Sequence, residues 1–353
     1  SVWLMPAPEC FQAFYFVCHD EDSLPAVIDA LRPLRMNGTL RSLAHVGNDY
    51  KVLAATSQFP ADETVTDGVL DREAMKRIRM KLGIGCWNGA GGLYGTRAQV
   101  REAKAQLRRA LAGKVDRLQF VNDRLLGLLD LFATPVRLLT GIDVRRMLKV
   151  IAPVYGLMKG VPTDETLGSA YWRKKGPLPE QMDPDRDGCG LLWCSPVVPN
   201  TGADAAAVTA LATRVLLAHG FEPQISISVA TERSLIAVTT ISYDRDVPGA
   251  DRRARDCYDE LVAELGLEAV ARGVGVRDLA PGGAHRLDDV DDEEQVDPAG
   301  VLVELGFHLA MLPEGLLRGG EDRLLVDVPR LPVDRRHEGL RLSRQRQGPR
   351  QSP

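Results

Sequence analysis

Aromatic residues almost disappear from this chain after residue 266. Residues 267–353 contain one aromatic side chain, Phe307, and Arg, Asp, Gly and Pro dominate their composition. A segment of this kind buries too little apolar surface to offset the chain entropy that is lost on ordering. We therefore expect a packed core within residues 1–266 and a degenerate, partly disordered segment over residues 267–353.

Two charged blocks in the later segment agree with this expectation. Residues 288–294 read DDVDDEE, and residues 335–351 are rich in arginine. Blocks of like charge usually stay solvated, although some act as acidic or basic recognition tails. We favour the solvated interpretation and leave the second one open.

The overall charge excludes two classes of partner. With 44 basic and 48 acidic residues, the formal net charge of −4 gives no field that would attract nucleic acid or an anionic membrane. No segment approaches the ~18 apolar residues of a membrane span, and the first residues do not form a leader peptide. We expect a soluble, cytoplasmic protein. The sequence opens as if in the middle of a domain, which suggests an N-terminal truncation.

The cysteines do not predict a metal site. They lack the CxxC spacing that closes a tetrahedral zinc site, and several lie in apolar segments, as reduced core cysteines do. Their positions are Cys10, Cys18, Cys86, Cys189, Cys194 and Cys257. Reduced thiols also fit a cytoplasmic compartment.

Strand and helix patterns alternate along the first 266 residues. A strand and a helix are expected within 10–36, where Ser23 and Pro25 mark the helix start, and Thr96 caps a further helix. The other predicted elements are a Gly-rich strand over 83–95, the helix over 97–111, a strand over 114–121, a connector over 156–184, a strand over 190–198, a helix over 203–219, strands over 224–230 and 234–243, and a helix over 248–265. This order predicts an α+β fold, with a mixed or antiparallel sheet flanked by helices and built from two ferredoxin-like halves.

The Gly-rich run over 83–95 invites a nucleotide-binding interpretation. A dinucleotide fingerprint needs GxGxxG between a strand and a helix, but Trp87 and Tyr94 occupy this run. We favour a strand whose glycines allow close backbone approach. None of the six histidines stands in a hydrolase or metalloprotease motif. His219 is expected to end a helix, where a positively charged side chain interacts favourably with the helix dipole.

Six long strings occur in collinear order along the first 265 residues. They are WLMPAPE (3–9), IDALRPLRMNGTL (28–40), GGLYGTRAQV (91–100), YGLMKGVPTDE (155–165), AYWRKKGPLPEQMDPDRDGCGLLWCSPVVPNTG (170–202) and ATERSLIAVTTISYDRD (230–246). Together they closely resemble the cap domain of the vanillyl-alcohol oxidase and p-cresol methylhydroxylase (4-cresol dehydrogenase) flavoprotein family.

This resemblance implies a reaction and a cofactor. The family oxidises the benzylic carbon of para-substituted phenols by hydride transfer to FAD, through a quinone methide, and the cap (residues 1–266 here) lines the substrate slot. The implied partners are a para-substituted phenol, a separate flavin-binding chain or a cytochrome c, and a second copy of the chain. Since no FAD-binding lobe is recognised in the sequence, the chain alone is expected to be inactive.

The resemblance also places three candidate residues. Trp193 matches an aromatic residue of the substrate slot, although a core tryptophan on a buried strand fits the pattern equally well. Leu191 matches the position of a histidine that bonds the flavin covalently in some relatives, so FAD is expected to be held non-covalently here and only with the missing lobe. Arg173 is a candidate for orienting a phenolate or a flavin group, or else a surface ion-pair partner.

Other positions depart from the family pattern or stay ambiguous. The Tyr-Arg pair that usually binds the phenolate in the family is absent, and only Arg272 lies near its place. Residues 297–300 read DPAG and match only part of a DPNG-like turn that follows later in the family. A shifted reading frame after about residue 265 would explain both. Glu232 and Arg233 fit a functional hairpin or a solvated one. A cap-only protein that binds an aromatic ligand or a flavin-binding chain is the alternative to the enzyme.

Overall fold

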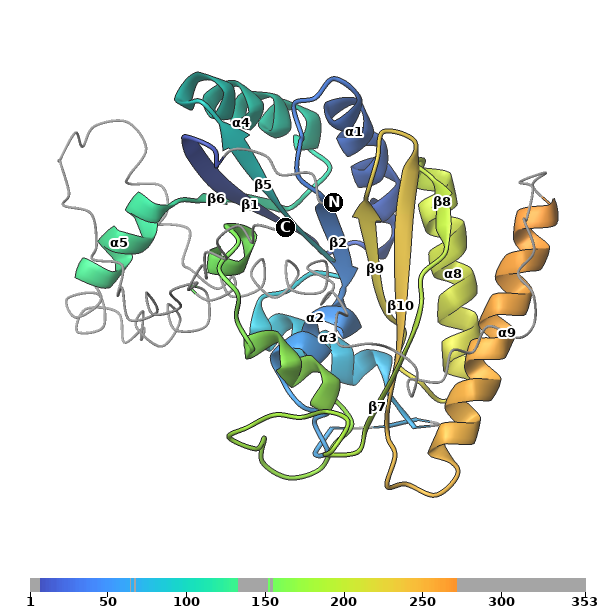
Figure 1. The fold of residues 1–353 in the computed structure, drawn as a ribbon. Coiled ribbons are helices and arrows are strands. Elements are labelled where there is room, and N and C mark those ends of the chain that lie inside the picture. The colour runs from blue at the N-terminus through green and yellow to red at the C-terminus, as the bar shows by residue number, and fades with distance from the viewer. Residues whose placement is uncertain (1–6, 64, 67, 133–151, 153–154, 272–353) are drawn as a thin grey trace, which may run out of the picture. The chain divides into compact units, whose positions relative to one another are not determined.

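The described part of the chain is built on one antiparallel sheet. The structure is a computed structural model that describes residues 7–63, 65–66, 68–132, 152 and 155–271 (Figure 1). In sheet order the strands are β6 (Arg117–Val121), β1 (Cys10–Cys18), β5 (Trp87–Gly95), β2 (Ala44–Asn48), β9 (Gln224–Val229), β10 (Ser234–Asp244) and β7 (Cys189–Cys194), and β8 (Val197–Pro199) also pairs with β10. Each of these pairs is antiparallel.

The sheet consists of two ferredoxin-like halves joined edge to edge. The first half runs β1-α1-β2-β5-α4-β6 and the second runs β7-α8-β9-β10-α9, and strand β2 of the first pairs with β9 of the second. The helices are α1 (Leu24–Met36), α4 (Arg97–Leu111), α8 (Gly202–Ala218) and α9 (Ala250–Ala271). The predicted α+β fold with an antiparallel sheet is confirmed.

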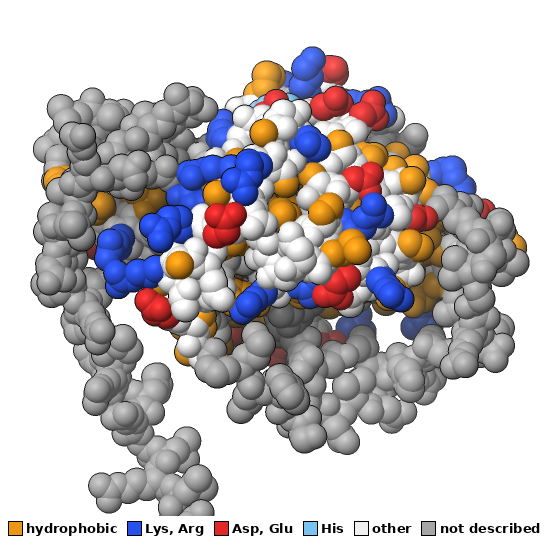
Figure 2. Space-filling view, turned by 90° about the horizontal axis from the view of Figure 1, so that it is seen from above, with side chains coloured by type: hydrophobic (Ala, Val, Ile, Leu, Met, Phe, Trp, Pro, Cys, Tyr) orange, Lys and Arg blue, Asp and Glu red, His pale blue; other side chains and the backbone are white. Residues whose placement is uncertain are grey.

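These four helices cover one face of the sheet, in the order α4, α1, α8, α9 (Figure 1). Between them and the sheet lies the main hydrophobic core, which includes Phe14, Val46, Ile227 and Leu235. The outer surface of the helices carries charged and hydrophobic side chains side by side. In Figure 2, the view from above, Lys and Arg side chains gather on the side where α4 lies, and Asp and Glu are interspersed with them.

The Gly-rich strand β5 shows why glycine is needed there. A Cβ atom on Gly89 or Gly91 would overlap the ring of Phe16 or Phe14 on the neighbouring strand β1. Strand β5 pairs with both β1 and β2, so its backbone belongs to the sheet ladder and does not form a phosphate loop. The next helix, α4, begins at a capping box in which Thr96 and Gln99 exchange hydrogen bonds.

A second cluster of short elements lies beside the sheet. It comprises α2 (Asp49–Thr56), β3 (Val65–Thr66), β4 (Val69–Leu70), α3 (Arg72–Leu82) and the 3₁₀ helix η2 (Glu165–Tyr171). Trp172 is fully buried among apolar side chains of α2 and α3. None of these elements was predicted from the sequence, and neither were η1 (Glu21–Ser23) and α5 (Asp123–Leu131).

Two predicted boundaries need correction. The single strand expected over 190–198 is two strands, β7 and β8, interrupted at Pro196, which has no N–H for the ladder. The last helix is longer than 248–265 and runs over Ala250–Ala271. Arg272 and the segments 288–294, 297–300 and 335–351 lie outside the described residues.

Candidate functional site

The sheet face opposite the four helices is unusual because its polar side chains are buried. Along β9, Ile225, Ile227 and Val229 enter the core under the helices, so the alternating residues Ser226 and Ser228 point to the other side. We call this side the polar face. Its residues include Tyr15, His45, Asn88, Gln119, Leu191, Trp193, Ser226, Ser228, Thr240 and Ser242.

One row of side chains crosses the polar face from strand to strand. The register places Gln119, Tyr15, Ala90, His45 and Ser228 next to one another on β6, β1, β5, β2 and β9. His45 Nδ1 lies 2.8 Å from the Ser228 hydroxyl oxygen, and both residues are buried. The row therefore has a hydrogen-bonded centre on strands β2 and β9.

Burial keeps the His45 imidazole neutral. Loss of solvent, reinforced by the positive charge of Lys51, lowers the pKa of His45 from its usual 6.5 to about 3. At neutral pH the ring therefore acts as a hydrogen-bonding group and carries no charge.

Helix α2 brings charged groups to the end of the same face. The Lys51 ammonium lies 3.1 Å from the Thr240 hydroxyl, and Lys51 is buried. Asp49, at the start of the helix, pairs with Arg79 of α3, but burial still raises the pKa of its carboxyl. The polar face thus combines a buried cation with neutral hydroxyl groups.

The structure places Trp193 and Leu191 together on the polar face. Both lie on β7, where Trp193 is opposite Thr240 and Leu191 is opposite Ser242 on β10. Trp193 is 44% exposed and Leu191 is half-buried, so neither side chain is enclosed in the core. A role for either residue in ligand binding stays a prediction.

Arg173 is held by a different set of groups. Its Nε lies 3.0 Å from Glu222 Oε2, and its Nη2 contacts Glu222 Oε1 and lies 2.7 Å from the carbonyl oxygen of Gly68. The guanidinium also stacks on the Phe59 ring, and Trp172 Nε1 donates to the same carboxylate at 3.1 Å. Within the described residues no hydrogen bond or ring contact joins Arg173 to Trp193 or Leu191. Its predicted contact with a phenolate or flavin therefore stays a prediction.

The remaining candidates have simple surroundings. Glu232 and Arg233 are exposed between β9 and β10, as in a solvated hairpin. His219 ends α8, and its Nε2 lies 2.9 Å from Glu260.

Five cysteines are buried and Cys10 is half-buried, and all six are free thiols. Within the described ranges, no cluster of three or more His, Cys, Asp or Glu side chains could hold a metal ion. Those ranges also contain no helix that is long and apolar enough to cross a membrane.

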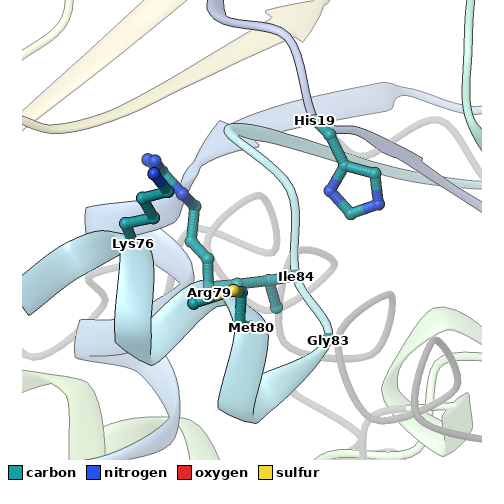
Figure 3. Close-up of a pocket in the computed structure, with 6 residues that line it drawn as sticks. All are labelled: His19, Lys76, Arg79, Met80, Gly83 and Ile84. Carbon is teal, nitrogen blue, oxygen red and sulfur yellow. The ribbon is translucent and has the colours of Figure 1, made fainter. Parts of the chain in front are cut away.

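A cavity of about 360 Å³ lies away from the predicted residues (Figure 3). Its lining residues are His19, Lys76, Arg79, Met80, Gly83 and Ile84. Figure 3 shows Lys76 and Arg79 extending from α3 and His19 on the segment that follows β1. Since Arg79 is already paired with Asp49, we do not take this cavity as the main site.

Sequence reasoning missed the centre of the polar face. His45, Lys51, Ser226 and Ser228 were not predicted as site residues. The strict alternation in QISISV (224–229) was a usable signal, because it marks one polar face of a strand. Such a face is usually exposed to water, and only the structure shows that this one is buried.

Comparison with known proteins connects this fold to flavoproteins. No family model matches the chain. The chain is 37% identical over 266 residues to 1'-carboxy-chondrochloren decarboxylase from Chondromyces crocatus. This alignment covers 75% of the chain and 49% of that protein. It is 26% identical over 269 residues to the 4-cresol dehydrogenase [hydroxylating] flavoprotein subunit of Pseudomonas putida. That alignment covers 76% of the chain and 45% of the subunit.

A solved structure gives the same relationship. The crystal structure of p-cresol methylhydroxylase with substrate bound matches with a TM-score of 0.60 and 26% identity, over 76% of this chain and 45% of that one. The chain therefore spans about half the length of the relatives it matches. The sequence strings, the sheet architecture and these matches all show that the chain is similar to the p-cresol methylhydroxylase and vanillyl-alcohol oxidase flavoprotein family over about half of the length of those relatives.

Proposed function

We propose that this chain forms the substrate side of an FAD-dependent oxidoreductase that oxidises the benzylic carbon of para-substituted phenols. The observation that carries the proposal is the polar face. It presents Trp193 and Leu191 beside buried hydroxyl groups on the side of the sheet that the four helices leave uncovered. A flat ring can lie against such a surface, while the polar groups fix its orientation.

The residues of this face suit a flavin that is not covalently attached. Leu191 has no nucleophilic atom, so it cannot form the flavin bond that the resemblance places at this position. When bound, FAD would accept a hydride from the benzylic carbon, and this chain would bind and orient the phenol and exclude water. Contacts to the FAD pyrophosphate and adenine would come from an FAD-binding lobe outside these residues.

The family match supports a second candidate reaction. The relative with 37% identity is named for a decarboxylation, whereas the 4-cresol dehydrogenase subunit is 26% identical. A para-hydroxyphenyl carboxylic acid is therefore the competing substrate class. Release of CO₂ from such an acid would favour the decarboxylase.

Reconstitution tests the proposal. The chain is purified alone, titrated with FAD, and then mixed with any flavin-binding polypeptide that a neighbouring gene encodes. We expect the isolated chain to be colourless, with FAD affinity no better than millimolar, and the mixture to bind FAD that acid precipitation releases. Anaerobic 4-cresol should then bleach the flavin absorbance of the mixture.

Each outcome has a clear meaning. Flavin that stays with the acid pellet would show a covalent anchor other than position 191. A flavin-loaded complex that neither 4-cresol nor the carboxylic acid reduces would refute the oxidoreductase, and would favour a cap-only protein that binds an aromatic ligand or a flavin-binding chain.

A further inference from the structure

The cavity of about 360 Å³ beside α3 takes no part in the proposed function. Its volume lies within the range of small-molecule sites. Its lining comes from α3, from the turn that ends this helix and from the segment after β1 (Figure 3). None of the lining residues lies on a strand of the polar face. The cavity is therefore a separate candidate site.

The polar lining of the cavity is basic at one end. Lys76 and Arg79, one turn apart on α3, both line it, and no carboxylate group is among its lining residues. Two carboxylates act on Arg79 from outside the lining, Asp49 through an ion pair and Glu21 through its electrostatic field. Because Asp49 offsets the charge of Arg79, Lys76 supplies the net positive charge at this end.

The opposite end of the cavity is less suited to an anion. Figure 3 shows His19 on the side away from Lys76 and Arg79. The backbone N–H of His19 donates to Asp116 at 2.7 Å, and the next three residues are acidic, with the sequence DED. We therefore expect an anion only at the end with Lys76 and Arg79.

The two cations are prepared for an anion in different ways. Arg79 Nη1 contacts Asp49, which occupies one of the five N–H donors of the guanidinium. The N–H of Ile84 donates to the Arg79 carbonyl oxygen at 3.1 Å and holds the turn against the helix. Lys76 is exposed, and within the described ranges no carboxylate lies at ion-pair distance from its ammonium. Arg79 thus offers fixed donors, and Lys76 offers an unpaired charge.

The rest of the lining includes an apolar wall. Ile84 is buried, whereas the Met80 side chain is 70% exposed. An anion without an apolar part would leave Met80 in contact with water. An aromatic body would cover Met80, whose thioether makes favourable contacts with rings. Since a cavity of about 150 Å³ is enough for benzene, this one has room for a ring and a carboxylate.

We propose that this cavity binds a small aromatic carboxylic acid. Its carboxylate accepts hydrogen bonds from Lys76 Nζ and from the guanidinium of Arg79, and its ring lies against Met80 and Ile84. Charge-assisted hydrogen bonds of this kind are about twice as strong as neutral ones. This inference goes beyond the proposed function and does not rest on it, because the acid and a phenol on the polar face occupy different places.

Calorimetric titration of the full 353-residue chain tests this with three probes. Phenylacetate carries the carboxylate and the ring, 2-phenylethanol has nearly the same size without the charge, and inorganic phosphate is an anion without the ring. We expect phenylacetate to bind with a Kd on the order of 1 mM, and the other two probes to bind at least about tenfold more weakly.

Three substitutions on α3 locate the binding. Lys76→Gln should weaken phenylacetate binding about fivefold, because it removes the unpaired charge, while Lys76→Arg should stay within about twofold of wild type. Lys81→Gln is the matched control, because Lys81 is exposed on the same helix and does not line the cavity. It changes the net charge equally and should leave the binding unchanged.

Carbon-13 NMR of the methionine methyl groups provides a readout on the wild-type chain. The Met80 resonance, assigned with Met80→Leu, should shift when phenylacetate is added and stay in place with 2-phenylethanol at the same concentration. Met36 is the internal control, because it is exposed on α1 and lies outside the cavity lining. Its resonance should not shift with either probe.

Four results would overturn the inference. A Met80 resonance that phenylacetate leaves in place would show that the acid does not bind in this cavity. Equal weakening by Lys76→Gln and Lys81→Gln would show attraction by net charge alone. If 2-phenylethanol bound as tightly as phenylacetate, the carboxylate would have no role, and if phosphate did so, the ring would have none.

Discussion

The two sides of strand β9 are both buried, yet they carry opposite chemistry. Ile225, Ile227 and Val229 face the helices, whereas Ser226 and Ser228 face the other way. Burying an aliphatic side chain contributes about 1.5–3 kcal/mol to stability, but burying a hydroxyl costs free energy unless a partner is found. Selection for stability alone would have made both sides apolar. This difference is the one expected if the helix-bearing side maintains the fold and the polar face serves the proposed ligand.

Neighbouring substitutions on β9 test this contrast most strongly. Ile227→Ala should lower the free energy of unfolding by about 2–5 kcal/mol, because it leaves a cavity in the core. Ser226→Ala should change it by less than about 0.5 kcal/mol or raise it slightly, because the lost hydroxyl has no partner. Urea unfolding followed by circular dichroism measures both. Equal losses would show that the polar face is an ordinary part of the core.

Two adjacent threonines on β10 sharpen the contrast, because valine has nearly the shape of threonine. Thr239 lies on the helix-bearing side with an unbonded hydroxyl, so Thr239→Val should stabilise the protein by about 1 kcal/mol. Thr240 on the polar face accepts from Lys51, so Thr240→Val should cost about 2 kcal/mol. Thermal unfolding of the two variants shows whether each substitution stabilises or destabilises the protein. The same sign for both would remove the distinction between the faces.

Local signals in the sequence were sufficient for much of the fold. The aromatic run of β1, the Thr96 cap and the alternating strands of the second half identify their elements through short-range chemistry, and each has its predicted type. The segment over 49–82 was missed for two reasons. Helix α3 has readable local signals that were overlooked, since Asp71 caps its start and Gly83 ends it. Helix α2 packs with Trp172, more than one hundred residues away, and no local pattern reveals that contact. The break at Pro196 was readable and was overlooked.

The site was less accessible from the sequence. Trp193 and Leu191 were found through the resemblance, and their shared face follows from their spacing of two along one strand. His45 became a candidate only when pairing between β2 and β9 placed it beside Ser228, a residue 183 positions away. Arg173 shows the reverse case, because the sequence could not reveal that Glu222 occupies its guanidinium.

The pH dependence of stability tests whether His45 is buried as described. The folded pKa is about 3 and the usual value is 6.5, so between these values the unfolded chain binds a proton that the folded chain does not. Stability should therefore fall as pH drops below 6.5. Between pH 7 and pH 5, wild type should lose about 2 kcal/mol more than His45→Gln. Unfolding at several pH values measures this, and His19→Gln should behave like wild type. A difference near zero would mean that His45 is exposed.

The last prediction concerns β7, where Trp193 and Leu192 point to opposite sides of the sheet. Leu192 packs against the core under the helices, whereas the Trp193 side chain is 44% exposed on the polar face. Trp193→Ala should therefore change the free energy of unfolding by less than about 1 kcal/mol, because little of its contact with the protein is lost.

The same substitution should weaken 4-cresol binding about tenfold if Trp193 is a wall of the proposed slot, since a stacked aromatic pair contributes about 0.5–1.5 kcal/mol beyond its buried area. Trp193→Phe should retain most of the affinity. Leu192→Ala is the matched control, expected to destabilise the chain more than Trp193→Ala while leaving the affinity of the folded protein unchanged. Calorimetric titration and urea unfolding of the three variants decide the matter. If Trp193→Ala destabilised the chain as much as Leu192→Ala and left 4-cresol binding intact, Trp193 would be a packing residue, and the slot would have to be sought elsewhere on the polar face.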